Sequence, residues 1–209
     1  MTQEHFDKAA NEWDQKKRRQ ELAKAIADAI ARLPLSSEMK AMEYGCGTGL
    51  VGLQLAPQLG SLTMVDTSTG MLEVLQNKIA ETGPANVTPL HLDLTADSLD
   101  ERFDLIFSAM TLHHIDDTEL ILKNLGGLLN DNGFLVIADL DSEDGSFHSA
   151  GADEKHHGFS REALAAILEN LGFSSPHFDT VHTISRTGDD QKTRSYPVFM
   201  LVAQKYHVF

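Results

Sequence analysis

Cysteine, long apolar runs and basic residues are all scarce in this 209-residue chain. Its one cysteine, Cys46, cannot form an internal disulfide, which fits a reducing compartment, and we expect a cytoplasmic protein. The longest uninterrupted apolar run, residues 198–203, is far shorter than the roughly 20 residues of a membrane-spanning helix. Charges at Glu4, Asp7 and Lys8 exclude a secretory signal peptide at the N-terminus. We therefore expect no membrane partner.

Lysine and arginine together number 17 against 31 acidic residues, a formal net charge of −14. The field of such a chain repels phosphate, which argues against nucleic acid as a partner. The charge is uneven, because residues 1–33 carry seven bases and six acids whereas the other 176 residues carry ten bases and 25 acids. The basic run at residues 16–19 is interpreted as solvated helix surface, with contact to nucleic acid as the minor alternative.

Hydrophobic periodicity predicts one α/β domain. Residues 15–33 place Leu22, Ile26 and Ile30 on one face of a helix that Pro34 ends. From residue 38 onward strands alternate with helices, which favours a parallel sheet with helices on both faces. The expected strands are 39–44, 62–66, 87–94, 103–109 and 134–140, and the expected helices are 50–59, 70–81, 120–129 and 160–170. Two further strands, 178–184 and 196–202, are joined by the short polar segment 186–195 and should be antiparallel.

A glycine-rich loop, Glu43-Tyr44-Gly45-Cys46-Gly47-Thr48-Gly49, follows the first strand and opens a helix. Glycine permits positive φ and lets backbone N–H groups approach a ligand closely. The pattern alone is ambiguous, because Gly47, Gly49 and Gly52 also satisfy the dinucleotide-binding spacing, and Asp66 lies 19 residues after Gly47. A nicotinamide cofactor and a turn that binds nothing therefore both stay open at this point.

Further motifs break this ambiguity. Val65-Asp66-Thr67-Ser68, with Met71 close behind, ends the second strand, and His91-Leu92-Asp93-Leu94 closes the third. A stretch from Phe103 to Met110 is followed by Leu112-His113-His114, and residues 125–137 contain Gly133 before the fifth strand. With the acid-led glycine loop, these motifs make residues 38–140 resemble a class I S-adenosylmethionine-dependent methyltransferase of the small single-domain type. The segment Asn130-Asp131-Asn132-Gly133 stands where that family often has a Pro-Gly-Gly turn, a conservative departure.

This resemblance implies a Rossmann-like three-layer sandwich with a seven-stranded, mostly parallel sheet and one antiparallel strand near the C-terminus. Residues 1–209 would form a single methyltransferase domain. Within it, residues 1–37 would be a helical cover, 38–140 the cofactor-binding core, 142–159 a lid-like loop, and 160–209 a helix and strand pair. A polar loop as long as 142–159 is usually functional.

The resemblance also implies the cofactor S-adenosylmethionine and the residues that bind it. Asp66 would accept both ribose hydroxyls, Asp93 the adenine amino group, and the Leu94 N–H would donate to the adenine ring. Backbone groups at Ser108 would reach the amino-acid end, and Trp13, with Phe6, would cover the donor or simply pack the first helix onto the sheet. The full expected set is Glu43, Gly45, Cys46, Gly47, Gly49, Asp66, Thr67, Met71, Asp93, Leu94, Ser108 and Trp13.

Methyl transfer needs alignment and exclusion of water, and a base only when the acceptor carries a proton. His113 and His114 are the candidates for that base, since they follow the fourth strand beside the predicted donor. A metal site is not predicted, although two sets of side chains invite one. These are Asp139 with Asp141, and the group His148, Asp153, Glu154, His156 and His157.

The sequence thus predicts an enzyme that transfers a methyl group from S-adenosylmethionine to a small-molecule acceptor. Nearly all residues go into the cofactor core, which favours a small acceptor over a macromolecule. Two alternatives are an NAD(P)-dependent oxidoreductase and a non-catalytic module that only binds S-adenosylmethionine.

Overall fold

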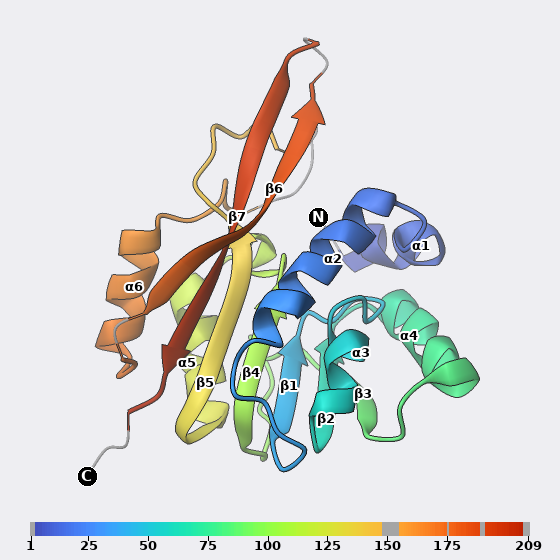
Figure 1. Cartoon of the computed structure of the whole chain (residues 1–209), viewed down its shortest axis with the longest axis vertical. Helices are drawn as coiled ribbons and strands as arrows, with labels where there is room; N and C mark the ends of the chain where they lie inside the picture. Colours follow the sequence, from blue (N-terminus) through green and yellow to red (C-terminus); the bar gives the residue numbers. More distant parts are fainter. Residues whose placement is uncertain (1–2, 148–154, 175, 189–190, 207–209) are drawn as a thin grey trace.

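A seven-stranded sheet forms the centre of the molecule in the computed structural model, which describes residues 3–147, 155–174, 176–188 and 191–206 (Figure 1). Its strand order is β3-β2-β1-β4-β5-β7-β6. β1 to β5 are all parallel, and β7 runs antiparallel to both of its neighbours, β5 and β6. The strands are β1 (Lys40–Tyr44), β2 (Ser61–Asp66), β3 (Val87–His91), β4 (Phe103–Ala109), β5 (Leu129–Leu140), β6 (His177–Thr187) and β7 (Thr193–Gln204). The predicted fold class, including the one antiparallel strand, is confirmed.

Helices cover both faces of this sheet and bury two separate apolar clusters. One face carries α2 (Lys17–Ile30), the short α3 (Gly52–Leu55) with the 3₁₀ turn η1 (Ala56–Gln58), and the inner side of α4 (Thr69–Thr82). The other face carries α5 (Thr118–Leu128) and α6 (Arg161–Asn170). Side chains of Ser68, Asp117 and Ser160 cap α4, α5 and α6 by accepting from backbone N–H groups of the first turn. Among the described residues, none of the helices combines the length and apolar content that crossing a bilayer requires.

Several predicted boundaries are wrong in an instructive way. The helix expected at 50–59 divides into α3 and η1, and the third strand ends at His91 rather than residue 94. The turn expected at 130–133 lies inside β5, because Leu129 already pairs with Phe103 and a register irregularity with a positive φ at Asn132 absorbs the turn-forming residues. The polar link 186–195 is largely strand, since its residues pair with each other from Arg186–Arg194 to Thr187–Thr193. At the start of β5 and at the end of the β6–β7 hairpin, pairing between strands overrides the local preference of polar and turn-forming residues for a loop.

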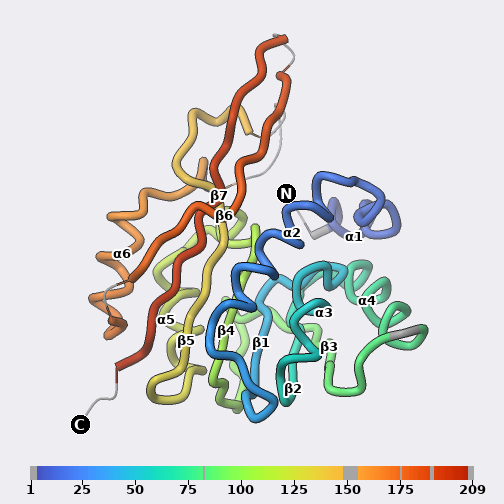
Figure 2. The backbone as a smooth tube through the Cα atoms, in the orientation of Figure 1, coloured from blue at the N-terminus to red at the C-terminus, as the bar shows by residue number. Residues whose placement is uncertain are grey.

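Helix α1 (Gln3–Trp13) was not among the predicted elements. It packs on α4, and both backbones approach closely, since a side chain at Gly70 would meet the Asp7 Cα at 2.9 Å. The tube in Figure 2 shows α1 and the start of α2 beyond the end of the sheet that carries the glycine loop, close to α4. The hairpin β6–β7 extends past the rest of the sheet, and α2 packs against β6 (Figures 1 and 2). These segments surround the carboxyl ends of the parallel strands.

Candidate functional site

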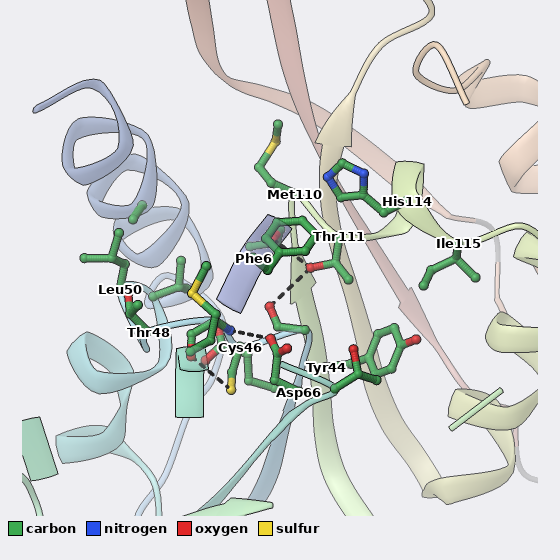
Figure 3. Close-up of a pocket in the computed structure, with 18 of the residues that line it drawn as sticks. Phe6, Tyr44, Cys46, Thr48, Leu50, Asp66, Met110, Thr111, His114 and Ile115 are labelled. Carbon is green, nitrogen blue, oxygen red and sulfur yellow. Dashed lines mark hydrogen bonds between the residues drawn. The ribbon is translucent and has the colours of Figure 1, made fainter. Parts of the chain in front are cut away.

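The glycine loop after β1 is held against β2 by backbone hydrogen bonds. The N–H groups of Gly45 and Cys46 both donate to the carbonyl of Val65, at 2.8 and 3.0 Å. Gly45 has φ +71°, and a side chain there would collide with Thr111, so glycine is required at this position. Figure 3 shows Thr111, which follows β4, against this loop, where its hydroxyl donates to the Gly45 carbonyl at 3.2 Å.

Asp66, the last residue of β2, ties this loop to the loop after β2. Its Oδ2 accepts from the Gly47 N–H at 2.7 Å and its Oδ1 from the Ser68 N–H at 2.8 Å. Burial raises the pKa of Asp66, the N–H groups of Ser68, Gly47 and Thr67 lower it, and the charge of Asp7 raises it. Each carboxylate oxygen can accept a second hydrogen bond, so Asp66 still offers two acceptor positions side by side.

Glu43 lies beneath the loop at only 2% exposure. Burial raises the pKa of this carboxyl well above its usual range, the Gly52 N–H that faces it lowers the pKa, and the charge of Asp66 raises it. Among the described residues, no donor reaches Glu43 Oε2 with hydrogen-bond geometry. Burial also raises the pKa of the Cys46 thiol, with Glu43 and Asp66 adding to the effect, which keeps Cys46 in its unreactive thiol form. An acidic group buried without a full set of donors favours a cationic ligand at this position.

A cavity of about 590 Å³ opens above these acids (Figure 3). That volume is typical of sites for cofactors and drug-sized ligands. The acids of the floor are Glu43, Asp66 and Asp93, and the roof is mostly apolar. The residues of the roof and the far wall include Phe6, Trp13, Arg19, Leu22, Ala23, Ile26, Met110, His114, Ile115, Leu120 and two further acids, Asp116 and Asp117.

Most of the residues expected to bind the cofactor meet at this cavity. Glu43, Gly45, Cys46, Gly47, Asp66, Thr67, Met71, Asp93 and Trp13 all line it. Asp93 lies at its edge, where Oδ1 accepts from the N–H and hydroxyl of Thr95 at 2.9 and 2.6 Å. The structure thus places in one cavity residues that are up to 80 positions apart in the sequence.

Three expected cofactor residues are not among the lining residues. Gly49 has φ +82° and faces Leu75 and Leu53, so it serves the turn and the packing of the following helix. The Leu94 side chain is buried in the core. Ser108 is buried as well, and its hydroxyl donates to the Tyr44 carbonyl at 2.8 Å. Their proposed backbone contacts to the cofactor stay predictions.

The two candidate catalytic histidines occupy different environments in the 3₁₀ turn η2 (Leu112–His114). His113 is 2% exposed, and its Nδ1 lies 2.6 Å from Oδ1 of the fully buried Asp139. His114 lines the cavity, with its ring 4.0 Å from that of His113 and 5.4 Å from that of Phe6, centroid to centroid. Only His114 is therefore in a position to touch a ligand, while His113 and Asp139 lie behind it.

The N-terminal helices close the cavity from above through two acidic side chains. Asp7 accepts from the Ser68 hydroxyl at 2.6 Å and from the Gly70 N–H at 3.0 Å, at the N-terminus of α4. Asp14 accepts from the Thr48 hydroxyl at 2.6 Å and forms an ion pair with Lys78. These two contacts place Phe6 and Trp13, whose ring centroids are 5.6 Å apart, over the cavity.

The segment expected to act as a lid is described at residues 142–147 and 155–159, while His148, Asp153 and Glu154 lie outside the described residues. Its second part is anchored beside the site, because the N–H groups of Lys155 and His156 both donate to the His113 carbonyl at 3.1 Å. The His156 ring nitrogen Nε2 lies 2.9 Å from the Ile115 carbonyl oxygen. His157 accepts from the Glu143 N–H through its carbonyl at 2.9 Å.

The metal alternatives find no support in the described part of the chain. Asp139 is taken up by His113 and by the N–H of Leu140, and Asp141 forms two hydrogen bonds of 2.7 Å with Arg161. In the described residues, no group of three or more His, Cys, Asp or Glu side chains is placed to hold a metal ion.

Sequence reasoning missed the residues that reach the cavity from outside the motifs. The interpretation of residues 16–19 as solvated surface holds for Lys16, Lys17 and Arg18, which are exposed, but not for Arg19, which lines the cavity. Leu22 and Ile26 belong to the predicted apolar stripe of α2, which gave no sign that it also forms a cavity wall. Met110 is an exception, because it ends the motif 103–110. It was not expected at the site, yet it lines the cavity with φ +55°. A non-glycine residue in that conformation is typical of strained functional sites.

Comparison with known proteins finds a matching family model and several relatives. A family model described as a methyltransferase domain matches residues 15–175. An uncharacterised methyltransferase of Mycobacterium tuberculosis is 35% identical over 114 residues, covering 54% of this chain and 55% of that protein. An uncharacterised methyltransferase of Schizosaccharomyces pombe is 28% identical over 155 residues, covering 66% of this chain and 55% of that protein. The chain thus spans about half the length of these relatives.

A solved structure with a similar fold is that of DhpI in complex with SAH, with a TM-score of 0.74 and 19% identity. The match covers 99% of this chain and 96% of that one. At 19% identity, this similarity shows a shared fold and nothing further.

Proposed function

Because this chain belongs to the methyltransferase-domain family, we propose that it transfers a methyl group from S-adenosylmethionine to a small-molecule acceptor. The family match confirms the resemblance that the glycine loop, Asp66 and the later motifs carried. It also sets aside the alternative of an NAD(P)-dependent oxidoreductase.

The observation that carries the proposal is the charge of the cavity floor. Glu43, Asp66 and Asp93 place three acids around the glycine loop, with Glu43 buried and short of donors. S-Adenosylmethionine carries a sulfonium and an ammonium cation, which such a floor stabilises, whereas the pyrophosphate of a dinucleotide would be repelled. Asp66 can hold the two ribose hydroxyls with its two remaining acceptor positions, and Asp93 can receive the adenine amino group.

The opposite side of the cavity supports an acceptor site. When bound, S-adenosylmethionine would supply an electrophilic methyl group. The acceptor's lone pair would bond to the methyl carbon as the carbon–sulfur bond breaks, and the bonding pair of that bond would stay on sulfur. Phe6, Trp13 and Ile26 exclude water from this space, which aligns the reactants and strengthens electrostatic interactions. His114 faces the space and takes the proton of a protonated acceptor, and His113 with Asp139 keeps the His114 turn in place.

The N-terminal segment 1–37 serves as the cover of this site, and the segment 142–159 serves as a lid beside it. The contacts of Asp7 and Asp14 support the first assignment, and the anchoring of His156 next to η2 supports the second. The acidic surface supports a small-molecule acceptor over nucleic acid. A cytoplasmic location fits Cys46, a free thiol kept reduced.

Two measurements on the full chain test the proposal. Isothermal titration with S-adenosylhomocysteine should give a Kd in the micromolar range or below, and NADH should not compete. A panel of phenols, carboxylic acids, amines and thiols with labelled S-adenosylmethionine should identify an acceptor. His114→Gln should then lower kcat by about 10²–10⁴ for an acceptor that must lose a proton, with S-adenosylhomocysteine affinity unchanged within about threefold.

His177→Gln is the matched control, because His177 is an exposed histidine on β6 that does not line the cavity. Failure to bind S-adenosylhomocysteine would overturn the cofactor assignment. Tight binding with no acceptor across the panel would favour the non-catalytic binding module instead.

A further inference from the structure

Arg19 is the one lysine or arginine among the described residues that line the cavity. The other ionisable side chains of the lining are acids, apart from the imidazole of His114, the thiol of Cys46 and the phenol of Tyr44. The acids of the floor suit the cationic donor, so they do not account for a guanidinium in the same cavity. Arg19 therefore points to a second ligand group, one of negative charge.

The guanidinium of Arg19 is held in place by Trp13. Its Cζ lies 3.3 Å from the centroid of the Trp13 ring, and Nη1 donates to the Trp13 carbonyl oxygen at 3.2 Å. Stacking on an aromatic face fixes the plane of a guanidinium and leaves its edge donors directed outward. Arg19 is therefore preorganised as a donor rather than being a mobile surface chain.

Within the described part of the chain, no carboxylate forms an ion pair with this guanidinium. In the described residues, Arg19 has no ion pair within 4.0 Å, and the acid next to it, Asp14, is already engaged by Thr48 and Lys78. Burial lowers the pKa of Arg19, the charge of Arg18 lowers it further, and only Asp14 opposes this. An arginine stays protonated under these conditions, so several N–H donors and a positive charge remain available to a ligand.

The positive charge continues from the cavity towards the outside. Arg18 is exposed on the same turn of α2. Burial lowers the pKa of Arg18, and the charge of Arg186 on β6 is close enough to lower it further. The Arg186 guanidinium lies 5.2 Å over the Phe147 ring. Like charges gathered at the junction of α2 and β6 repel each other and are costly without an anion to bind.

We propose that Arg19 binds the anionic group, a carboxylate or a phosphate, of the methyl acceptor, and that Arg18 and Arg186 attract this anion to the entrance. The inference rests on the proposed function and specifies its substrate class: an organic anion with an apolar or aromatic body. That body packs against Phe6, Ile26 and Met110, while the anion takes the edge donors of Arg19. The carboxylate of the donor is a single charge inside the cavity, and it leaves the exposed Arg18 and the half-buried Arg186 unexplained.

Binding of simple probes to the protein saturated with S-adenosylhomocysteine tests the inference. Benzoate and phenyl phosphate are compared with the neutral benzamide and benzyl alcohol, by calorimetry and by the fluorescence of Trp13, the only tryptophan. We expect the anions to bind at least tenfold more tightly than the neutral probes. Arg19→Met should abolish this preference, Arg19→Lys should restore part of it, and Arg32→Met, an exposed arginine just past the end of α2, should leave it unchanged.

The affinity of Arg19→Met for S-adenosylhomocysteine separates the two sources of a carboxylate. Affinity within twofold of the wild type, with the anion preference lost, supports the acceptor site. A fall of tenfold or more in that affinity, with the anion preference retained, means that Arg19 holds the donor's carboxylate and overturns the inference. Equal binding of anionic and neutral probes to the wild type also overturns it, whereas failure of the wild type to bind S-adenosylhomocysteine would overturn the proposed function.

Discussion

The floor of the cavity and its roof are built in opposite ways. The floor consists of the glycine loop, Glu43 and Asp66, which are mostly buried and tied together by short hydrogen bonds to backbone N–H groups at the ends of β1 and β2. The roof consists of α1 and the start of α2, which reach the floor through the side chains of Asp7 and Asp14. We therefore propose a preformed donor site under a cover that detaches without disturbing the sheet.

The hydrogen bonds of the floor join residues that are closer in sequence than those joined by the hydrogen bonds of the roof. The hydrogen bond from Gly47 to Asp66 spans 19 residues within one β-α-β unit. The contacts of Asp14 with Thr48 and of Asp7 with Ser68 span 34 and 61 residues. A local unit forms its site as it folds, whereas the roof depends on contacts that close long loops. Three substitutions test whether floor and roof are as different as this comparison states.

The largest effect is expected from the floor, at Asp66. Asp66→Ala removes the acceptor for two ribose hydroxyls, and hydrogen bonds to a charged group contribute about 1.5–3 kcal/mol each. We expect the Kd for S-adenosylhomocysteine to rise about a hundredfold or more, by calorimetry, with the circular dichroism spectrum unchanged. Asp97→Ala, an exposed acid beyond β3, is the control. Unchanged affinity in a folded Asp66→Ala protein would refute the ribose assignment.

A smaller effect, with a defined pH dependence, is expected at Glu43. Its pKa in the folded protein is raised, so the folded state binds more protons than the unfolded state above about pH 4.5, and stability falls as pH rises from there. Glu43→Gln removes this penalty, and the variant should gain stability relative to the wild type from pH 5 to pH 8 in urea unfolding. It should also bind S-adenosylhomocysteine about tenfold more weakly, because an amide cannot ionise to the carboxylate that the donor's ammonium would stabilise.

Glu38→Gln, an exposed acid before β1, controls for the change in net charge. A stability difference between Glu43→Gln and the wild type that does not change with pH would contradict the raised pKa. Unchanged affinity would place the donor's cation elsewhere.

The smallest effect is expected from the roof, at Asp7. Asp7→Ala removes the acceptor for the Ser68 hydroxyl and the Gly70 N–H, so α1 should detach more often. We expect S-adenosylhomocysteine to dissociate about threefold to tenfold faster in stopped-flow fluorescence of Trp13, with little change in Tm. In the wild type these contacts lower the pKa of Asp7, so the attachment is present above about pH 3.8 and is lost only as pH falls through the lowered pKa.

Glu12→Ala, an exposed acid on the same helix, should leave the dissociation rate unchanged. If Asp7→Ala lowered Tm as much as a core substitution does, α1 would be an integral part of the fold and the comparison of floor and roof would fail.

Much of the floor could be predicted from the sequence because its determinants are local. The acid-led glycine loop and Asp66 stand out by their spacing, and the resemblance adds Asp93. Glu43, Gly45, Gly47, Asp66 and Asp93 all line one cavity. The helix cap at Ser160 is equally local. By contrast, spacing could not distinguish His113 from His114, because burial against Asp139 depends on the neighbouring strand β5.

The amino-acid sequence by itself determined the α/β fold class, the donor-binding loop and the acids that surround it, because hydrophobic period and glycine placement act over a few residues. The tertiary structure alone decided that α1 packs on α4, that His114 lines the cavity whereas His113 does not, and that Arg19 is the one lysine or arginine of the described lining. These outcomes depend on which surfaces meet when long loops close, and no local pattern encodes such meetings.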